Sequence, residues 1–187
     1  MDRDAPLLDL LIELQVLDRV PRMGFLLRGV DDPESVSEHS FHVTLLVWAL
    51  AEEIPKVDQS RAMAMALLHD LAEVRLGDLP KTTARFLPSE TKRAAEAAVF
   101  EDLTAPLGER ASNLLKEYQE AQSAEAKLVK ACDKLALMIK ATAYDDWQTG
   151  ALAEFWENSD NFPAADLPPV ERLFSLLRER RAKAKRS

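Results

Sequence analysis

The segment from residue 36 to residue 51, VSEHSFHVTLLVWALA, restricts the fold more than any other part of this chain. Ser35 and Glu38 have the spacing of a capping box, which predicts that a helix begins at this point. The helix is apolar on nearly every side, and such a helix needs neighbours all round. We therefore expect it to lie buried in the middle of a domain, with His39 in its first turns.

Helical periodicity continues through most of the chain. Leucines at helical spacing predict a first helix over residues 7–17, and Ser60 and Gly77 bracket a helix predicted from residue 60 to about residue 75. The composition agrees, because aromatic residues make up only 6% and there are 5 glycines among many good helix formers. The fold class we expect is all-α. Further helices are predicted over residues 89–103, 109–122 and 123–144, and a last one through Leu173, Leu176 and Leu177.

The chain has the size and apolar content of one compact domain. It has 187 residues, of which 47% are hydrophobic, and it shows no internal repeat and no domain boundary. We expect one domain over residues 1–187, with a core over about residues 7–160 and a C-terminal helix with a basic tail over residues 170–187. The basic tail is interpreted as a solvated helix end.

Charge and cysteine content exclude several classes of protein. A net charge of -8 argues against a nucleic-acid partner and an acidic membrane surface, because phosphate groups would be repelled. No apolar stretch approaches the ~18 residues that suggest a membrane span. The single cysteine, Cys132, excludes an intramolecular disulfide and is expected in the core, and the N-terminus lacks a basic secretory region. We therefore expect a cytoplasmic protein.

The residues that suggest chemistry are histidines and aspartates on apolar helices. The chain has 3 histidines; His39 and His69 both fall on apolar segments, and Asp70 follows directly. Because burying an acid is costly, Asp70 and Asp133 need partners. Imidazole and carboxylate ligands together suit Mn, Fe, Co, Ni or Zn and leave coordination positions for water and substrate, which favours hydrolysis.

Spacing alone leaves a second interpretation open. A buried histidine usually bonds a carbonyl, and a buried aspartate usually meets a lysine, a cap or a hydroxyl. Neighbouring residues of a helix also point about 100° apart, so His69 and Asp70 are not a self-evident chelate. A structural role for these residues is therefore compatible with the spacing.

The sequence segments around these residues resemble those of a known family. They are RVPR at 19–22, PESVSEHS at 33–40, LHDLAEVRLGDLP at 68–80 and SAEAKLVKACDK at 123–134. Together they resemble the HD superfamily of metal-dependent phosphohydrolases, in its 5′-deoxynucleotidase branch, from the first helix to about Phe162. The resemblance implies an HD-type helical domain with one divalent cation held by four ligands: His39, His69, Asp70 and Asp133.

The resemblance also implies a reaction and roles for two acids. The reaction is hydrolysis of the phosphate monoester of (deoxy)ribonucleoside 5′-monophosphates to nucleoside and phosphate. Glu73 would orient or deprotonate the attacking water, because on a helix it faces the same side as His69 and Asp70. Asp78 would assist proton transfer or help Glu73 hold a second, Mg-like ion. Without the resemblance, both acids would be interpreted as a solvated helix end.

A dianionic phosphate needs positive charge as well. Arg19, Arg22 and Arg28 are concentrated before the helix that carries His39, and their guanidinium groups could bind phosphate oxygens, with Lys81 as a weaker candidate. Surface arginines are more often only solvated. Some members of the family carry a tryptophan after the first arginine where this chain has Val20, so selectivity for deoxyribose stays open.

Other functions remain possible at this point. A related phosphohydrolase could act on a cyclic nucleotide, a triphosphate or a guanosine polyphosphate with the same metal chemistry. A non-catalytic nucleotide-binding module and a purely structural helical protein are the alternatives from other classes. His42 is outside the motif and is assigned a structural or supporting role. The resemblance further suggests a homodimer.

Overall fold

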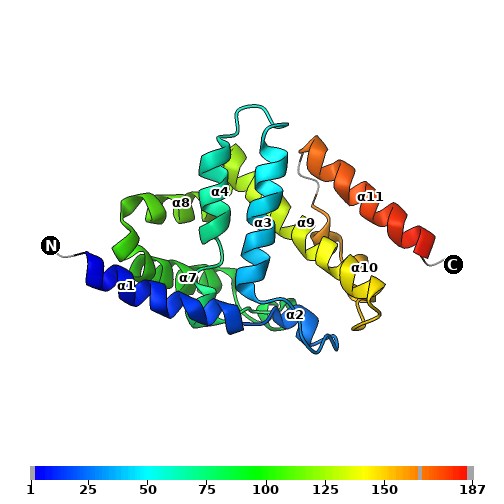
Figure 1. Ribbon diagram of the computed structural model, residues 1–187, viewed down its shortest axis with the longest axis horizontal. Coiled ribbons are helices and arrows are strands. Elements are labelled where there is room, and N and C mark those ends of the chain that lie inside the picture. The colour runs from blue at the N-terminus through cyan, green and yellow to red at the C-terminus, as the bar shows by residue number, and fades with distance from the viewer. Residues whose placement is uncertain (1–2, 164–165, 185–187) are drawn as a thin grey trace.

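The computed structural model describes residues 3–163 and 166–184, and three long helices form its centre. They are α3 (Val36–Ala51), α4 (Gln59–Leu68) and α9 (Ala124–Asp146). Figure 1 shows α3 and α4 side by side with α9 crossing them, and α3 packs most extensively on these two helices. The predicted capping box is confirmed: the Ser35 hydroxyl accepts the Glu38 N–H, and the Glu38 carboxylate accepts the Ser35 N–H at 2.7 Å.

The expectation that α3 is buried on every side is only partly correct. His39, Val43 and Val47 are fully buried against α4 and α9. On the opposite face Phe41 and Trp48 are 62% and 55% exposed. Within the described ranges the neighbours of α3 cover only its inner side, so its apolar outer face is open to solvent.

A second group of helices packs beside this centre. The helix α1 (Asp4–Glu13) continues as the 3-10 helix η1 (Leu14–Arg19), and apolar side chains of both reach toward α7 and α8. A smaller apolar cluster fills the space between them, built on Leu10, Leu17, Val36, Leu71, Ala72, Phe100, Leu103 and Leu115. The remaining bounds on this side are α7 (Ser89–Thr104), η2 (Ala105–Leu107) and α8 (Glu109–Glu120).

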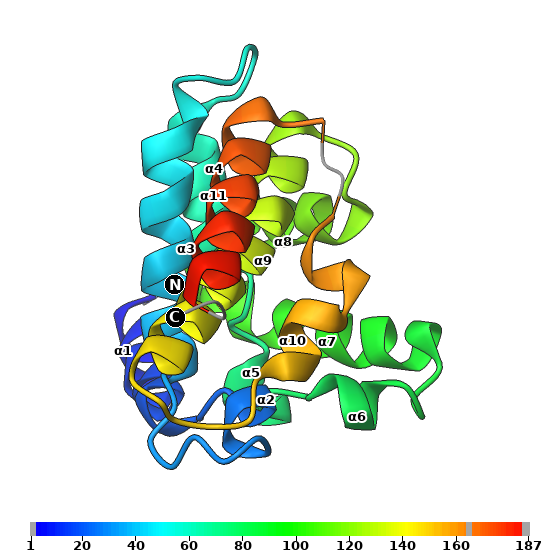
Figure 2. The same cartoon turned by 90° about the vertical axis from the view of Figure 1, so that its right-hand side faces the viewer.

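The end of the chain lies on the other side of the centre. The helix α11 (Pro168–Ala184) packs along α9, and the short elements gather at one end of the molecule (Figure 2). These short elements are α2 (Met23–Leu26), α5 (Glu73–Leu76), α6 (Lys81–Ala84), α10 (Ala153–Glu157) and η3 (Ser159–Asn161). No strand occurs in the described residues apart from one isolated bridge between Pro21 and Ser35, so the all-α prediction is confirmed.

Two predicted helices differ from the structure. The first is α-helical only to Glu13, after which the chain tightens into the 3-10 form. The predicted helix over residues 60–75 begins one residue earlier, capped by Asp58, and stops at Leu68. The next residues form tight turns, with the Leu71 N–H donating to the Leu68 carbonyl, before α5 begins.

Three further expectations concern the surface and the core. Cys132 is buried and free, as predicted. In the part of the chain that the structure describes, no helix combines the length and apolarity needed to cross a bilayer. The last three residues of the predicted basic tail, 185–187, lie outside the described residues.

Candidate metal centre

Three potential metal ligands meet where α3, α9 and the end of α4 come together. His39, His69 and Asp70 each offer one ligand atom, and these atoms all lie within 4.8 Å of one another. Asp133 on α9 adjoins them, since its Oδ1 lies 3.0 Å from His39 Nε2. Both histidines are buried, at 0% and 3% exposure, although imidazole is a polar group.

His69 is oriented by the backbone. Its Nδ1 lies 2.6 Å from the carbonyl of Ala66, and a ring nitrogen facing a carbonyl is assigned as the N–H donor. Its Nε2 then carries a lone pair, is buried, and has no hydrogen-bond partner among the described residues. A carboxylate oxygen of Asp70 lies 3.2 Å from this atom. Two acceptors at this distance are stabilised by a cation between them, so these residues fit a divalent ion.

The break between α4 and α5 explains how adjacent residues reach one site. In a continuous helix His69 and Asp70 would point about 100° apart. Because α4 ends at Leu68 and the chain turns tightly, the Asp70 carboxylate comes to lie beside the His69 ring and 3.9 Å from His39 Nε2. The same break starts α5 at Glu73.

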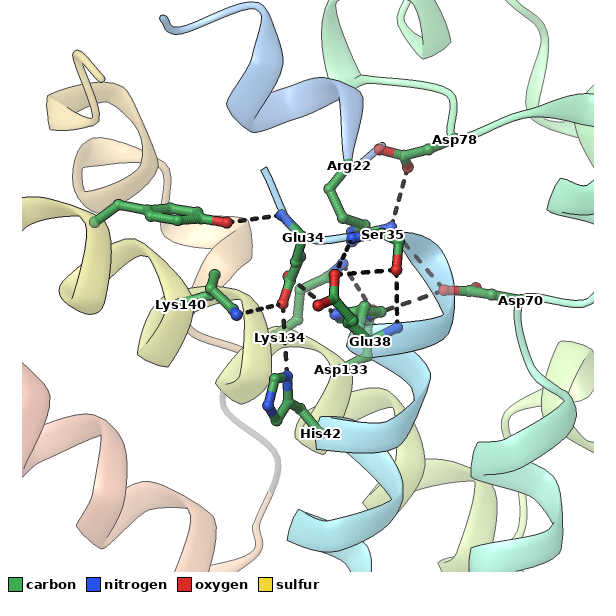
Figure 3. Close-up of polar contacts among 12 residues, drawn as sticks. Arg22, Glu34, Ser35, Glu38, His42, Asp70, Asp78, Asp133, Lys134 and Lys140 are labelled. Carbon is green, nitrogen blue, oxygen red and sulfur yellow. Dashed lines mark hydrogen bonds and ion pairs between the residues drawn. The ribbon is translucent and has the colours of Figure 1, made fainter. Parts of the chain in front are cut away.

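Four carboxyl groups surround the site, and two cations lie among them: Asp70, Glu73, Asp78 and Asp133 with Arg22 and Lys134. Arg22 Nη1 lies 3.0 Å from Asp78 Oδ1 and 4.0 Å from an oxygen of Asp70, as Figure 3 shows, and it also lies 4.0 Å from an oxygen of Glu73. Lys134 Nζ lies 3.0 Å from Asp133 Oδ2. Negative charge therefore exceeds positive charge, which favours an added cation.

The carboxyl groups have opposite pKa shifts. Burial opposes the ionisation of Asp70, but His69 and His39 in their protonated forms, together with Arg22, outweigh burial and hold the pKa of Asp70 below its usual value. Burial likewise opposes the ionisation of Asp133, but Lys134 and His39 outweigh burial and hold the pKa of Asp133 well below its usual range. Burial and the charge of Asp70 raise the pKa of Glu73 strongly, against the influence of Arg22. Carboxyl groups with separated pKa values suit ligation by one and proton transfer by another.

Asp78 uses both oxygens within the fold. Its Oδ1 accepts from Arg22, and its Oδ2 accepts the backbone N–H of Met23 at 2.6 Å. The residue follows Gly77, whose φ of +70° is strained for any side chain. Asp78 thus fixes the start of α2 and the direction of the Arg22 side chain.

Two cavities open from the site. The larger, of about 1050 Å³, is lined by His69, Asp70, Glu73 and Asp133 among others. The smaller, of about 370 Å³, lies between α2, α6 and the α10–η3 segment, and it has Phe25 and Phe155 in its wall. Both are bordered by Asp78 and by the cations Arg22, Lys92 and Lys134. A ligand could therefore reach from the candidate metal centre into the smaller cavity.

Comparison with known proteins agrees with this geometry. The profile of the HD domain matches residues 14–167, which is most of the chain. The chain belongs to the HD domain family. Among curated proteins, it is 34% identical to the 5′-deoxynucleotidase HDDC2 of Danio rerio over 89% of this chain and 84% of that protein. It is 32% identical to HDDC2 of Homo sapiens, over 76% of this chain and 71% of that protein.

Solved structures support the same fold. A conserved hypothetical protein of Pyrococcus furiosus superposes with a TM-score of 0.78 at 34% identity, covering 94% of this chain and 99% of that one. The HD-type helical domain expected from the sequence is therefore the observed fold. The residues matched by the family profile include every part of the candidate metal centre.

The predicted phosphate-binding residues of this HD domain lie in different surroundings. Arg22 is only 12% exposed in its side chain and lies among the acids. Arg28 and Lys81 line the smaller cavity and pair with Glu154 and Asp160 across it. Arg19 is exposed at the end of η1 and lines neither cavity. The structure thus brings three of the four cations to the cavities.

Two charged residues near the centre were not singled out from the sequence. Glu34 precedes α3, is 2% exposed in its side chain, and has Oε1 3.6 Å from His39 Nδ1. Lys134 pairs with Asp133 and borders both cavities. Both lie inside the sequence segments that carry the family resemblance, and each is close in the chain to the proposed ligand that it contacts, His39 or Asp133.

Proposed function

We propose that this protein hydrolyses the phosphate monoester of deoxyribonucleoside 5′-monophosphates to deoxynucleoside and inorganic phosphate. The observation that carries the proposal is the meeting of His39, His69 and Asp70, with a buried and unpartnered nitrogen on His69. The names of the HDDC2 relatives support the substrate class.

The proposed metal ligands are His39, His69, Asp70 and Asp133. A divalent cation bound there would supply a Lewis acid and would activate water at neutral pH. We propose a single ion. The guanidinium group of Arg22 already provides positive charge between Glu73 and Asp78, where a second, Mg-like ion was considered from the sequence.

The remaining charged groups are given roles in the reaction. Glu73 borders the larger cavity, and the charge of a metal ion bound beside it would counter the rise of its pKa and keep it ionised, so that it accepts the proton of the attacking water as the new P–O bond forms. Arg22 and Lys134 bind the oxygens of the phosphate, whose negative charge they offset. The bond from phosphorus to the 5′-oxygen breaks, and that oxygen takes from Glu73 the proton that came from the water and leaves as the nucleoside hydroxyl. Asp78 holds Arg22 in place for this step.

The smaller cavity is the proposed site for the nucleoside. Its volume of about 370 Å³ lies within the range of small-molecule sites, and it offers apolar surface at Phe25 and Phe155 with a polar edge at Asn158. Arg28 and Lys81 close the cavity through their ion pairs to α10 and η3. Both residues are therefore proposed to hold the substrate in position, whereas the exposed Arg19, which lines neither cavity, is not given this role.

The test is phosphate release from a panel of substrates by wild type and by Glu73→Gln. The panel contains ribo- and deoxyribonucleoside 5′-monophosphates, cyclic nucleotides, triphosphates and guanosine polyphosphates, each with Mn, Co, Fe, Ni, Zn or Mg or with chelator. We expect turnover of the deoxyribonucleoside monophosphates that chelator abolishes and that the substitution lowers by a factor of about 10² or more. The monophosphate pairs also test sugar selectivity, which Val20 leaves open.

Other outcomes would change the proposal in defined ways. Activity restricted to cyclic nucleotides, triphosphates or guanosine polyphosphates would keep the metal centre and overturn the substrate. Binding of nucleotides without turnover under any metal would indicate a regulatory nucleotide-binding module instead.

We also propose that two copies form a homodimer in the cytoplasm. The exposed stripe on α3, formed by Phe41, Leu45 and Trp48 at 62%, 48% and 55% exposure, supports an interface. The free, buried Cys132 is compatible with a reducing compartment. Light scattering of wild type and of Trp48→Glu tests the dimer. We expect the mass of a dimer for wild type and the mass of a monomer for Trp48→Glu, and a monomeric wild type would refute the proposal.

A further inference from the structure

The two candidate histidine ligands differ in what faces their second ring nitrogen. For His69 the backbone carbonyl of Ala66 lies 2.6 Å from Nδ1 and fixes the ring. His39 Nδ1 is buried and has no hydrogen-bond partner among the described residues. Its nearest charged group is Glu34, whose Oε1 lies 3.6 Å away and is likewise buried without a hydrogen-bond partner.

We propose that Glu34 is a positioning residue that accepts a hydrogen bond from His39 Nδ1 and so leaves Nε2 free to bind the metal. A metal-binding histidine donates its other ring N–H to an acceptor, which fixes both the ring orientation and the nitrogen that carries the lone pair. The gap of 3.6 Å is slightly longer than a hydrogen bond, and a small rotation of either side chain closes it. This inference rests on the proposed metal centre.

The backbone of Glu34 is held from both directions. Its N–H donates to the hydroxyl of Tyr144 at 2.7 Å, and its carbonyl accepts the N–H of Arg22 at 2.9 Å. Ser35, the next residue, caps α3. The Glu34 side chain is therefore placed against the first turns of α3, which carry the proposed metal ligand His39.

The other carboxylate oxygen of Glu34 has its own partners. Oε2 lies 3.2 Å from Lys140 Nζ and 3.6 Å from His42 Nδ1, as Figure 3 shows. These two cationic or donor groups hold Oε2 away from the centre, so Oε1 is the oxygen that faces His39. Because Lys140 lies on α9 and His42 on α3, the carboxylate also joins the two helices that carry His39 and Asp133.

This arrangement makes Glu34→Gln an informative substitution. A carboxamide has the same shape but only one acceptor oxygen, and its NH2 group only donates. The charged Lys140 amine takes that oxygen, which turns the NH2 group toward His39 Nδ1. His39 would then carry its proton on Nε2, the nitrogen needed for the metal. The substitution is thus expected to preserve packing and to weaken metal binding.

The experiment measures Zn²⁺ affinity by competition with a chromophoric chelator for four proteins. They are wild type, Glu34→Gln, Lys140→Met and the double variant Glu34→Gln/Lys140→Met. We expect Glu34→Gln to bind Zn²⁺ about 10- to 100-fold more weakly than wild type, and Lys140→Met alone to change affinity little. In the double variant the amide can turn its oxygen to His39, so part of the affinity returns. A merely structural role for Glu34 predicts no such rescue.

Nitrogen NMR of the zinc-loaded wild type gives a second test that needs no variant. With ¹⁵N-histidine labelling only 3 ring systems contribute, because the chain has 3 histidines. We expect His39 to be protonated at Nδ1 and zinc-bound at Nε2. Coordination through Nδ1, or wild-type affinity in Glu34→Gln, would overturn the role of Glu34 alone. Absence of zinc coordination by both His39 and His69 would overturn the proposed metal centre and this inference with it.

Discussion

His69 Nε2 and Asp70 Oδ2 lie 3.2 Å apart although the two residues are neighbours in the chain. This contact exists because α4 ends at Leu68 and the backbone turns before α5. The ring of His69 is locked by the Ala66 carbonyl, so the contact cannot relax by rotation of the ring without loss of that bond. Both atoms are electron-rich and fixed at this distance, so they repel each other unless a cation lies between them. The site therefore favours binding of a cation.

The first prediction is that a divalent ion stabilises the protein against heat. An ion that binds only the folded state at a hundred times its Kd adds about 2.7 kcal/mol, which raises Tm by about 5–10 °C for a chain of this size. Asp70→Asn should abolish the shift, because the amide is a poorer ligand and carries no charge. Differential scanning fluorimetry with Mn²⁺ or Zn²⁺ after chelator treatment measures it.

Asp146→Asn is the matched control for this prediction. Asp146 lies at the end of α9, where it pairs with Arg180 on the surface, away from the centre. Its Tm shift with metal should equal that of wild type. An equal shift in Asp70→Asn would mean that the ion binds elsewhere.

Local sequence signals were sufficient to predict most helix starts. Helix caps are local signals of this kind. Ser35, in its capping box with Glu38, and Ser123 each accept a backbone N–H from a residue only a few positions along the chain, so these caps can be recognised from the sequence alone. The end of α4 was missed because residues 69–72 contain neither glycine nor proline. Packing of Leu71 and Ala72 into the smaller apolar cluster accompanies the turn there, and such contacts are not local.

The same limit applies to the candidate centre. The family resemblance named the four proposed ligands, and the structure brings them together from three elements. The resemblance could not assign contacts such as Glu34 to Lys140 or Arg22 to Asp78, because these join segments that are far apart in the chain. A buried glutamate before a capping box is a usable signal, since such a charge needs a partner.

The second prediction concerns the charge balance around Arg22. Arg22→Met leaves Asp78 and its acidic neighbours without their central cation, which should lower the free energy of unfolding by about 3–5 kcal/mol in metal-free protein. Added Zn²⁺ or Mn²⁺ should recover part of this loss, because the ion offsets the same charges. Urea denaturation with chelator and with metal measures both effects.

Arg172→Met provides the comparison for Arg22. Arg172 pairs with Glu53 on the surface, where both side chains are at least half exposed, so its loss should cost less than about 1 kcal/mol. If Arg22→Met cost no more than this control, the guanidinium group would not be compensating the acids.

The third prediction separates the roles of Asp78 and Glu73. Asp78→Asn weakens the bond to Arg22 and should raise KM about tenfold with a small change in kcat, because one charge-assisted contact is worth about 1.5 kcal/mol or more. Glu73→Gln should lower kcat by a factor of about 10²–10⁴ with little change in KM, because the base is lost. Steady-state kinetics on a deoxyribonucleoside monophosphate decides between them. A large kcat loss in Asp78→Asn would instead support the proton-transfer role considered from the sequence.

The fourth prediction concerns Gly150, which holds the loop before α10 against the loop after α2. Its φ is +80°, and a Cβ there would lie 2.7 Å from Val30 Cγ2 and 3.2 Å from the Arg28 carbonyl. The next residue, Ala151, donates its N–H to that same carbonyl at 2.6 Å. Gly150→Ala therefore meets both backbone strain and a clash, and should cost about 2–4 kcal/mol of folding free energy.

Substitution of Gly29 distinguishes backbone strain from steric clash. The φ of Gly29 is +81°, nearly the same as that of Gly150, but a Cβ added at Gly29 would meet only the Gly150 Cα, at 4.0 Å. Gly29→Ala should therefore cost only the conformational part, about 1 kcal/mol. Urea denaturation of both variants gives the difference, and equal losses would show that Val30 yields to the added methyl group. Gly150→Ala should also raise KM, because the shifted loop leads directly into α10, which carries Glu154, the partner of Arg28 at the smaller cavity. An unchanged KM beside a large loss of stability would mean that this loop supports the fold without shaping the proposed nucleoside site.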